Sequence, residues 1–260
     1  MERKCKIYCK GNHLVPDVWI NTVASNMNRL IYIKSGKGEY LENGVMYPLE
    51  AGRMYFIPSY SGGVPTYTGT VDRIDHAYLN FFLTPPIVSR KVFSLDPYSS
   101  PKLKNALEAW CELCKGSFNS RLQPYPTAPE TVRDFELLKS LTVYLAETAV
   151  KDSPESVIND PNIATALEIM HNSLSEKLTV AQIAEKCYMS TDGFIRKFKH
   201  YLGETPYSYL KKLKLATAEY LRYEGATLEE AAEKCGYSDA SALLHAIASY
   251  RHAPAGNIRR

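Results

Sequence analysis

The chain has 260 residues, of which 45% are hydrophobic and 23% charged, and its formal net charge at pH 7 is +3. This length exceeds that of a typical single domain, so the chain can bury more than one core. The net charge is too small to indicate nucleic-acid binding by itself. The first residues lack the apolar run of a signal peptide, and no stretch reaches the ~18 apolar residues of a membrane span. We therefore expect a cytoplasmic protein without a membrane partner.

The region before about residue 96 predicts short β-strands. Apolar and tyrosine-rich runs are separated by turn signals such as Ser35-Gly36, Asn43-Gly44 and Ala51-Gly52. The expected strands are Leu30 to Ile33, Glu39 to Leu41, Met54 to Ile57 and Ala77 to Leu83. Strands at this spacing are typical of a barrel or a sandwich.

The expected strand around His76 has two chemically different faces. Alternation places one polar and aromatic set on one face, namely His76, Tyr78, Asn80 and Phe82, and an apolar set on the other, namely Ala77, Leu79, Phe81 and Leu83. This pattern suits a barrel that holds a small polar ligand inside and packs on helices outside. Trp19, Arg29 and Tyr32 are further candidates for the same interior, and an ordinary core or surface role is the alternative for each.

The cysteines and histidines bear on a metal site or an enzyme. Cys111 and Cys114 have a ligand-like spacing, but a structural zinc site usually needs a second pair close by. Before residue 170 the only histidines are His13 and His76, which are too few for a metal-dependent cupin enzyme. No nucleophile-elbow, phosphate-loop or dinucleotide motif is present. We expect free thiols, no metal, no cofactor and no catalytic residue.

Two helices are predicted between residues 97 and 150, from Pro101 to about Lys115 and from Thr131 to about Ala149. The second has apolar residues at helical spacing, namely Val132, Phe135, Leu138, Leu141 and Leu145. One face of these helices is expected to cover the strands, and leftover apolar surface such as Leu137 and Tyr144 could pair two subunits. Residues 151–160 predict a polar linker.

The stretch from Thr179 to Pro206 recurs in altered form from Thr227 to Pro254, and each copy predicts a helix-turn-helix. Both copies open with a capping box, in which a Thr is followed three residues later by Gln182 or Glu230. The first helix of each copy carries apolar residues at the same spacing, namely Val180, Ile183, Ala184 and Cys187, and Leu228, Ala231, Ala232 and Cys235.

Ser190 and Ser238 are the expected caps of the second helix in each copy. The apolar stripes of these helices are Phe194, Phe198 and Tyr201, and Leu243, Ile247 and Tyr250, so one residue has entered the second turn. Their opposite faces carry Asp192, Ile195, Arg196 and Lys199, and Ser241, Leu244, His245 and Ala248. A recognition helix presents such a face to a major groove, whereas a plain helical repeat would leave it merely solvated.

Basic residues cluster in and after the first copy. Residues 194–214 hold six Lys or Arg side chains and one acid, Glu204, which favours a surface that faces phosphates. The expected base contacts are Asp192, Ile195, Arg196, Ser241, Leu244 and His245, and the expected phosphate contacts are Lys199, Lys211, Lys212 and Arg251. Because no Lys or Arg occurs between Gly236 and Tyr250, we expect the second copy to contribute less to DNA affinity.

The two copies resemble the DNA-binding domain of the AraC/XylS family of bacterial transcription regulators. The first copy matches the family pattern at Ile183-Ala184, Ser190, Phe194, Arg196, Phe198-Lys199, Gly203, Pro206 and Tyr209-Leu210. The second copy matches at Ala232, Gly236-Tyr237-Ser238-Asp239 and Ser241, and the pattern then fades. The run from Tyr32 through Gly36, Gly38, Gly44, Tyr47 and Gly52 to Phe56-Ile-Pro58 resembles the cupin-type sensor half common in this family.

The resemblance implies an α+β chain of two domains. It implies an N-terminal cupin-like β-barrel with flanking helices, and an all-α C-terminal domain in which a long helix from Tyr207 to about Tyr223 joins the two helix-turn-helix units. The expected division is a barrel over 1–96, helices for packing and dimerisation over 97–150, a linker over 151–160 and a DNA-binding domain over 161–260. His76 and Tyr78 resemble a His-x-aromatic pair that lies in the effector pocket of sugar-sensing members, and Asn80, Arg29, Trp19 and Tyr32 complete the expected effector site.

The implied function is a sequence-specific transcription regulator. Its expected partners are double-stranded DNA, a small polar effector of the carbohydrate class, a second copy of the chain and RNA polymerase. Two alternatives stay open. A constitutive regulator whose barrel serves only for dimerisation predicts no effect of a ligand, and a cupin enzyme fused to a DNA-binding domain predicts metal in the purified protein.

Overall fold

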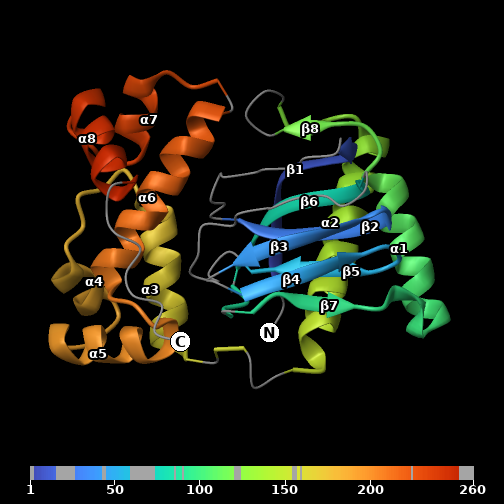
Figure 1. The fold of residues 1–260 in the computed structure, drawn as a ribbon, viewed down its shortest axis with the longest axis horizontal. Helices are drawn as coiled ribbons and strands as arrows, with labels where there is room; N and C mark the ends of the chain where they lie inside the picture. Colours follow the sequence, from blue (N-terminus) through green and yellow to red (C-terminus); the bar gives the residue numbers. More distant parts are fainter. Residues whose placement is uncertain are drawn as a thin grey trace. The chain divides into compact units, whose positions relative to one another are not determined.

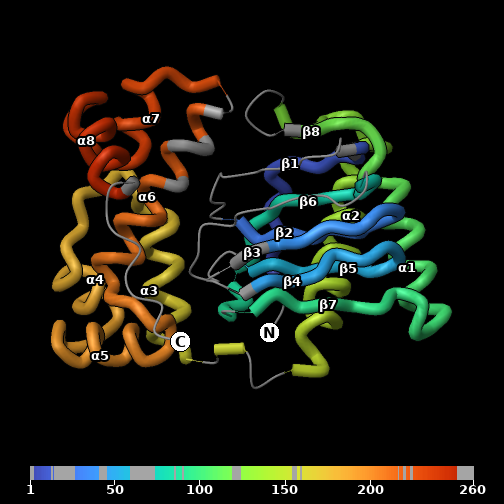
Figure 2. The backbone as a smooth tube through the Cα atoms, viewed as in Figure 1, coloured from blue at the N-terminus to red at the C-terminus, as the bar shows by residue number. Residues whose placement is uncertain are grey.

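The computed structural model describes residues 3–15, 27–42, 45–58, 74–84, 86–89, 91–119, 124–153, 157–158, 160–223 and 225–251. The described residues divide into two compact units, one that ends at Asp160 and one that begins at Pro161. Figures 1 and 2 show the strands in the first unit and an all-helical second unit. None of the described helices is both long and apolar enough to cross a membrane.

The first unit contains a six-stranded antiparallel sheet and a separate two-stranded hairpin. The sheet has the strand order β7-β5-β2-β6-β1-β8, and β3 pairs with β4 in the hairpin. The strands are β1 (Lys4–Val15), β2 (Asn28–Ser35), β3 (Lys37–Glu42), β4 (Val45–Glu50), β5 (Met54–Ile57), β6 (Ile74–Thr84), β7 (Phe93–Leu95) and β8 (Phe118–Asn119). The closed barrel expected from the sequence is therefore not present among the described strands.

Two helices cover one face of this sheet. After a short 3-10 turn, η1 (Pro97–Ser99), α1 (Pro101–Leu113) begins where the Ser100 hydroxyl accepts a hydrogen bond from the Leu103 N–H, and α2 (Pro129–Lys151) follows. Trp110 of α1 is fully buried, and its indole N–H donates to the Thr142 hydroxyl of α2 at 3.1 Å. Both helices match the sequence prediction within a few residues.

The end of the expected linker belongs to the first unit. The helix α2 extends to Lys151, and Val157 forms an isolated antiparallel bridge with Ser89. The N–H of Ile158 donates to the carbonyl of Val88 at 2.8 Å. Backbone pairing therefore fixes the chain just before the second unit begins at Pro161.

The second unit consists of six described helices. They are α3 (Pro161–Asn172), α4 (Val180–Lys186), α5 (Thr191–Leu202), α6 (Pro206–Tyr223), α7 (Leu228–Lys234) and α8 (Ala240–Arg251). The long helix α6 joins α4–α5 to α7–α8, as the sequence predicted (Figure 1). Its Tyr209 packs on Phe198, whereas Leu215, Ala218 and Leu221 lie in the core of the second helix-turn-helix.

Candidate nucleic-acid interface and ligand-binding face

Both helix-turn-helix units begin with the predicted capping box. The Thr179 hydroxyl accepts from the Gln182 N–H at 3.2 Å, and the Thr179 N–H donates to Gln182 Oε1 at 2.8 Å. In the second unit the corresponding distances are 3.1 Å from the Glu230 N–H to the Thr227 hydroxyl and 2.8 Å from the Thr227 N–H to Glu230 Oε2. The hydrogen bond from the Thr227 backbone holds the pKa of Glu230 below its usual value.

The helix α5 presents the predicted recognition face. Ser190 caps the helix by accepting from the Gly193 N–H at 3.3 Å, and Phe194 and Phe198 are fully buried. On the opposite face Asp192, Arg196 and Lys199 are exposed and Ile195 is half-buried. Asp192, Ile195 and Arg196 line an open surface hollow of about 470 Å³. Burial of the phenylalanine stripe thus leaves the expected base-reading side chains at the surface.

The cap of α8 differs from the prediction. Asp239, not Ser238, caps this helix, because Asp239 Oδ1 accepts from the Ala242 N–H at 2.8 Å. The Ser238 hydroxyl instead donates to Asp239 Oδ2 at 3.0 Å. The residue inserted in the second turn has moved the cap by one position. The hydrogen bond from the Ala242 N–H also holds the pKa of Asp239 below its usual value.

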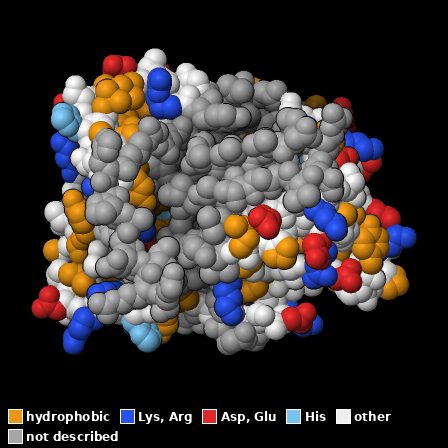
Figure 3. All heavy atoms as spheres, in the orientation of Figure 1, with side chains coloured by type: hydrophobic (Ala, Val, Ile, Leu, Met, Phe, Trp, Pro, Cys, Tyr) orange, Lys and Arg blue, Asp and Glu red, His pale blue; other side chains and the backbone are white. Residues whose placement is uncertain are grey.

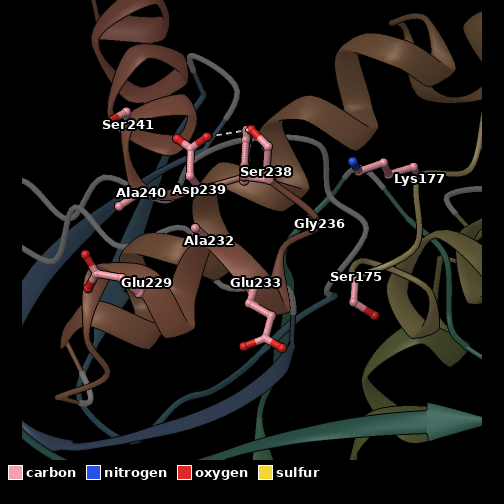
Figure 4. Close-up of a pocket in the computed structure, with 11 residues that line it drawn as sticks. Ser175, Lys177, Glu229, Ala232, Glu233, Gly236, Ser238, Asp239, Ala240 and Ser241 are labelled. Atoms are coloured by element: carbon pink, nitrogen blue, oxygen red, sulfur yellow. Dashed lines mark hydrogen bonds between the residues drawn. The ribbon is translucent and has the colours of Figure 1, made fainter.

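The predicted contact residues of α8 reach the surface, but their surroundings are acidic. Ser241, Leu244, His245 and Ala248 all lie there. Next to them is a hollow of about 580 Å³, drawn in Figure 4, to which α7 contributes Glu229 and Glu233 and the start of α8 contributes Asp239. Among the described residues that line this hollow, only Lys177 is basic. The surface here is less favourable to phosphate than that of α5.

The six basic residues of the cluster differ in their availability. Arg196 and Lys199 are exposed, and Lys and Arg side chains reach the surface beside α5 (Figure 3). Lys212, a predicted phosphate contact, is half-buried with its Nζ 3.0 Å from Glu204 Oε2, and Lys211 is also half-buried. Arg251 ends α8, but its side chain lies outside the described residues.

Two further lysines of the cluster form hydrogen bonds with other residues of the second unit. Lys197 Nζ donates to Asn162 Oδ1 at 3.2 Å, and Lys214 Nζ lies 3.5 Å from the carbonyl of Glu176. Burial holds the pKa of Lys214 below its usual value. Arg196 and Lys199 therefore carry the exposed positive charge of the first recognition face.

In the first unit, β6 has the two faces predicted from the sequence. Its apolar residues lie in the core cluster beneath α1 and α2. Tyr78 instead packs against a second cluster, which contains residues of β2 and β5 together with Tyr40 and Leu49 of the β3–β4 hairpin. The rings of His76 and Tyr78 are 5.8 Å apart. Asn80 is 9% exposed, and its Nδ2 donates to Cys9 Sγ at 3.2 Å. Within the described part of the chain, Asn80 Oδ1 is buried and has no hydrogen-bond partner.

Two residues of β2, Arg29 and Tyr32, were expected in the effector site, and only Arg29 lies on this face. Arg29 stands opposite Asn80 in the register and is buried, so it shares the face of His76. Tyr32 stands opposite Ala77 and lies in the helix-covered cluster, where its hydroxyl is 2.8 Å from that of Tyr98. The expectation that Tyr32 faces the ligand is therefore wrong. Trp19 lies outside the described residues.

The two cysteines with a ligand-like spacing, Cys111 and Cys114, lie in the first unit. Cys114 is buried and Cys111 half-buried, and burial raises the pKa of the Cys111 thiol to about 11. All six cysteines are free thiols. Among the described residues, no group of three or more His, Cys, Asp and Glu side chains could hold a metal ion.

Comparisons with known proteins connect these surfaces to a family. Residues 183–260 match the family model described as a helix-turn-helix domain. A putative AraC-like transcription regulator of Streptomyces lividans is 33% identical over 102 residues, which are 39% of this chain and 34% of that protein. The transcriptional activator RhaR of Pectobacterium atrosepticum is 24% identical over 229 residues, which are 83% of this chain and 78% of RhaR. The chain thus spans about a third of the length of the first relative.

The solved structure of ToxT from Vibrio cholerae has the same fold. Its TM-score is 0.60 at 12% sequence identity, and the match covers 96% of this chain and 94% of ToxT. It confirms a two-part fold with a β-sheet N-terminal part and a helical C-terminal part. The relatives are named as transcription regulators. These matches support the resemblance to the AraC/XylS family, and residues 183–260 of the second unit match a helix-turn-helix domain.

Proposed function

We propose that this protein is a transcription regulator that binds double-stranded DNA sequence-specifically through its second unit. The observation that carries the proposal is α5, whose buried Phe194 and Phe198 orient exposed Arg196 and Lys199 away from the core. Helix-turn-helix proteins insert such a helix into the major groove, where Arg reads guanine and Lys meets phosphate. Its relatives are named as transcription regulators, which supports the same function.

Selection from a random-sequence DNA library tests this function without a known operator. The purified protein should enrich one family of duplexes. It should bind a selected duplex at least about a thousandfold more tightly than a scrambled duplex of the same composition. Both affinities should fall with rising salt as phosphate contacts are screened. Equal affinity for the two duplexes at every salt concentration would overturn the proposal.

We further propose that the first unit binds a small polar effector on the face of β6 that carries His76, Tyr78 and Asn80, with the sheet and the β3–β4 hairpin as the walls of a cupin-like site. The buried Asn80 Oδ1, which lacks a partner among the described residues, supports a ligand that donates a hydrogen bond. The rings of Tyr78 and His76 offer faces for the apolar side of such a ligand. Hydroxyl-rich carbohydrates have this combination of donors and apolar faces.

A thermal-shift panel distinguishes carbohydrates from other ligands. A structure of ToxT with an unsaturated fatty acid bound is known, so the panel contains sugars and fatty acids. A sugar should raise the melting temperature of the unaltered protein and of Tyr32→Phe, whose side chain lies on the other face of the sheet. His76→Ala with Tyr78→Ala should lose this shift. A shift by fatty acids alone contradicts the carbohydrate class, and the absence of any shift favours a constitutive regulator.

We also propose that α2 pairs two copies of the chain. The buried side of this helix is mainly apolar, and two further apolar residues lie outside it, because Leu137 is 50% exposed and Val132 is 36% exposed. Analytical ultracentrifugation should show a dimer that dissociates in Leu137→Asp. A monomeric unaltered protein at micromolar concentration would contradict this assignment.

A further inference from the structure

The turns of the two helix-turn-helix units contain an equivalent left-handed residue. Tyr188 has a φ of 56° and Gly236 a φ of 71°, and each directly follows the cysteine that ends the first helix of its unit. Glycine adopts this left-handed conformation readily, whereas it is unfavourable for residues with a Cβ atom. The same strained position is thus occupied by glycine in one copy and by a bulky aromatic residue in the other.

Packing explains why residue 236 is a glycine. A Cβ atom at Gly236 would lie 2.7 Å from the carbonyl oxygen of Leu174 and 2.9 Å from that of Ser175, and Figure 4 shows Gly236 beside Ser175. These atoms belong to the backbone and cannot rotate away. The second turn therefore requires glycine because another segment of the same unit packs on it.

No packing contact within the described chain accounts for the left-handed backbone conformation of Tyr188. Its side chain is 96% exposed, and in the described residues its phenol has no hydrogen-bond partner. Its backbone N–H donates to the carbonyl of Glu185 at 2.9 Å, which any residue at this position would do. Neither packing nor hydrogen bonding inside the described unit compensates for the left-handed conformation of a tyrosine. A strained, exposed residue of this kind points to a function outside the fold.

The location of Tyr188 indicates what it contacts. It lies two residues before the cap Ser190 and close in sequence to Asp192, at the end of α5 that a recognition helix directs into the groove. The exposed Lys186 precedes it by two residues. The backbone phosphates flank the groove, and tyrosine hydroxyls are among the groups that bind phosphate oxygens.

We propose that the Tyr188 hydroxyl donates a hydrogen bond to a DNA phosphate beside the groove occupied by α5. This inference rests on the proposed function of the second unit. It adds a neutral contact to the charged contacts of Arg196 and Lys199. A neutral hydrogen bond to the backbone adds affinity for all sequences alike and leaves the salt dependence unchanged.

Tyr188→Phe tests the hydroxyl, and Tyr207→Phe is the matched control. Tyr207 is another tyrosine of the second unit, 69% exposed, at the start of α6. Fluorescence anisotropy is measured on the duplex selected by the unaltered protein and on its scrambled counterpart. Tyr188→Phe should bind both about three- to tenfold more weakly than Tyr207→Phe, with an unchanged salt slope. Equal affinity of the two variants would overturn the hydroxyl contact.

Tyr188→Gly supplies a second readout, because it removes the side chain and the backbone strain together. Its melting temperature should rise by about 4 °C, while its DNA affinity falls as in Tyr188→Phe. A structural role for Tyr188 predicts the opposite sign for the melting temperature, and such a fall would contradict the proposal. If the unaltered protein selects no duplex, the proposed function fails; if it does and Tyr188→Gly binds normally, only the Tyr188 contact fails.

Discussion

A Cβ atom at Gly236 would lie 2.7 Å from the carbonyl oxygen of Leu174, so the turn of the second helix-turn-helix packs backbone to backbone on the segment after α3. Lys214 of α6 reaches the same place, with its Nζ 2.9 Å from that Cβ position. Three segments distant in sequence therefore meet at Gly236. This contact, in addition to α6, ties the second helix-turn-helix to the segment between α3 and α4.

Gly236→Ala should destabilise the second unit more than Gly225→Ala. Gly225 also has a positive φ, 91°, but a Cβ atom there would meet nothing within 4 Å. Gly225→Ala should cost about 1 kcal/mol for backbone strain, whereas Gly236→Ala should cost about 3 kcal/mol because the carbonyls of Leu174 and Ser175 must also move. Chemical denaturation of both variants gives these free energies, and equal costs would contradict the packing described here.

The stability of the second unit should fall on mild acidification because of His171. Burial lowers the pKa of His171 from 6.5 to about 3, and its Nε2 lies 3.1 Å from the hydroxyl of Tyr209. A histidine with a lowered pKa in the folded state binds its proton more readily when unfolded, so stability declines as pH falls below about 6.5. By pH 5 the loss from this group should be about 2 kcal/mol.

Denaturant unfolding at pH 7 and pH 5 measures this linkage. In His171→Gln the difference in unfolding free energy between the two pH values should be smaller by about 2 kcal/mol than in the unaltered protein. The two proteins share every other titrating group, so the subtraction isolates His171. An identical pH dependence would show that His171 is not buried in its neutral form.

The second recognition helix should bind DNA more tightly when it is given the side chains of the first. His245 and Ala248 of α8 lie at the positions equivalent to Arg196 and Lys199. The double substitution His245→Arg with Ala248→Lys should tighten binding and steepen the salt slope by about one unit for each additional phosphate that the helix reaches. His245→Gln with Ala248→Gln, which adds no charge, is the matched control. Unchanged affinity and slope in the first variant would show that α8 does not approach DNA.

Much of the second unit could be predicted from the sequence because its signals are local. The capping boxes, the apolar stripes and the exposed faces depend on residues within one helix, and α4, α5 and α7 follow them. The sequence does not decide the cap of α8, because Ser238 and Asp239 are both good caps. Only the hydrogen bond from Ala242 to Asp239 identifies the second as the cap.

Less of the first unit could be predicted because strand pairing is not local. The sequence does not predict β1, since a register shift between Ile7 and Cys9 interrupts its alternation. The alternation of β2 does predict the position of Tyr32. Arg29 and Tyr32 are three residues apart in β2, so alternation places them on opposite faces and both cannot face one ligand. The pairing of Ser89 with Val157 has no sequence signal.

The specificity of Arg196→Ala tests the central claim most directly, with Lys199→Ala as its counterpart on the same exposed face of α5. Affinities are measured for the selected duplex and for its scrambled counterpart over a range of salt. Arg196→Ala should lower the difference in binding free energy between the two duplexes by about 1–3 kcal/mol, and with it the ratio of the two affinities, because one bidentate contact to guanine is lost. Lys199→Ala should weaken both duplexes equally and reduce the salt slope by about one unit. A ratio that Arg196→Ala leaves unchanged would contradict base reading by α5.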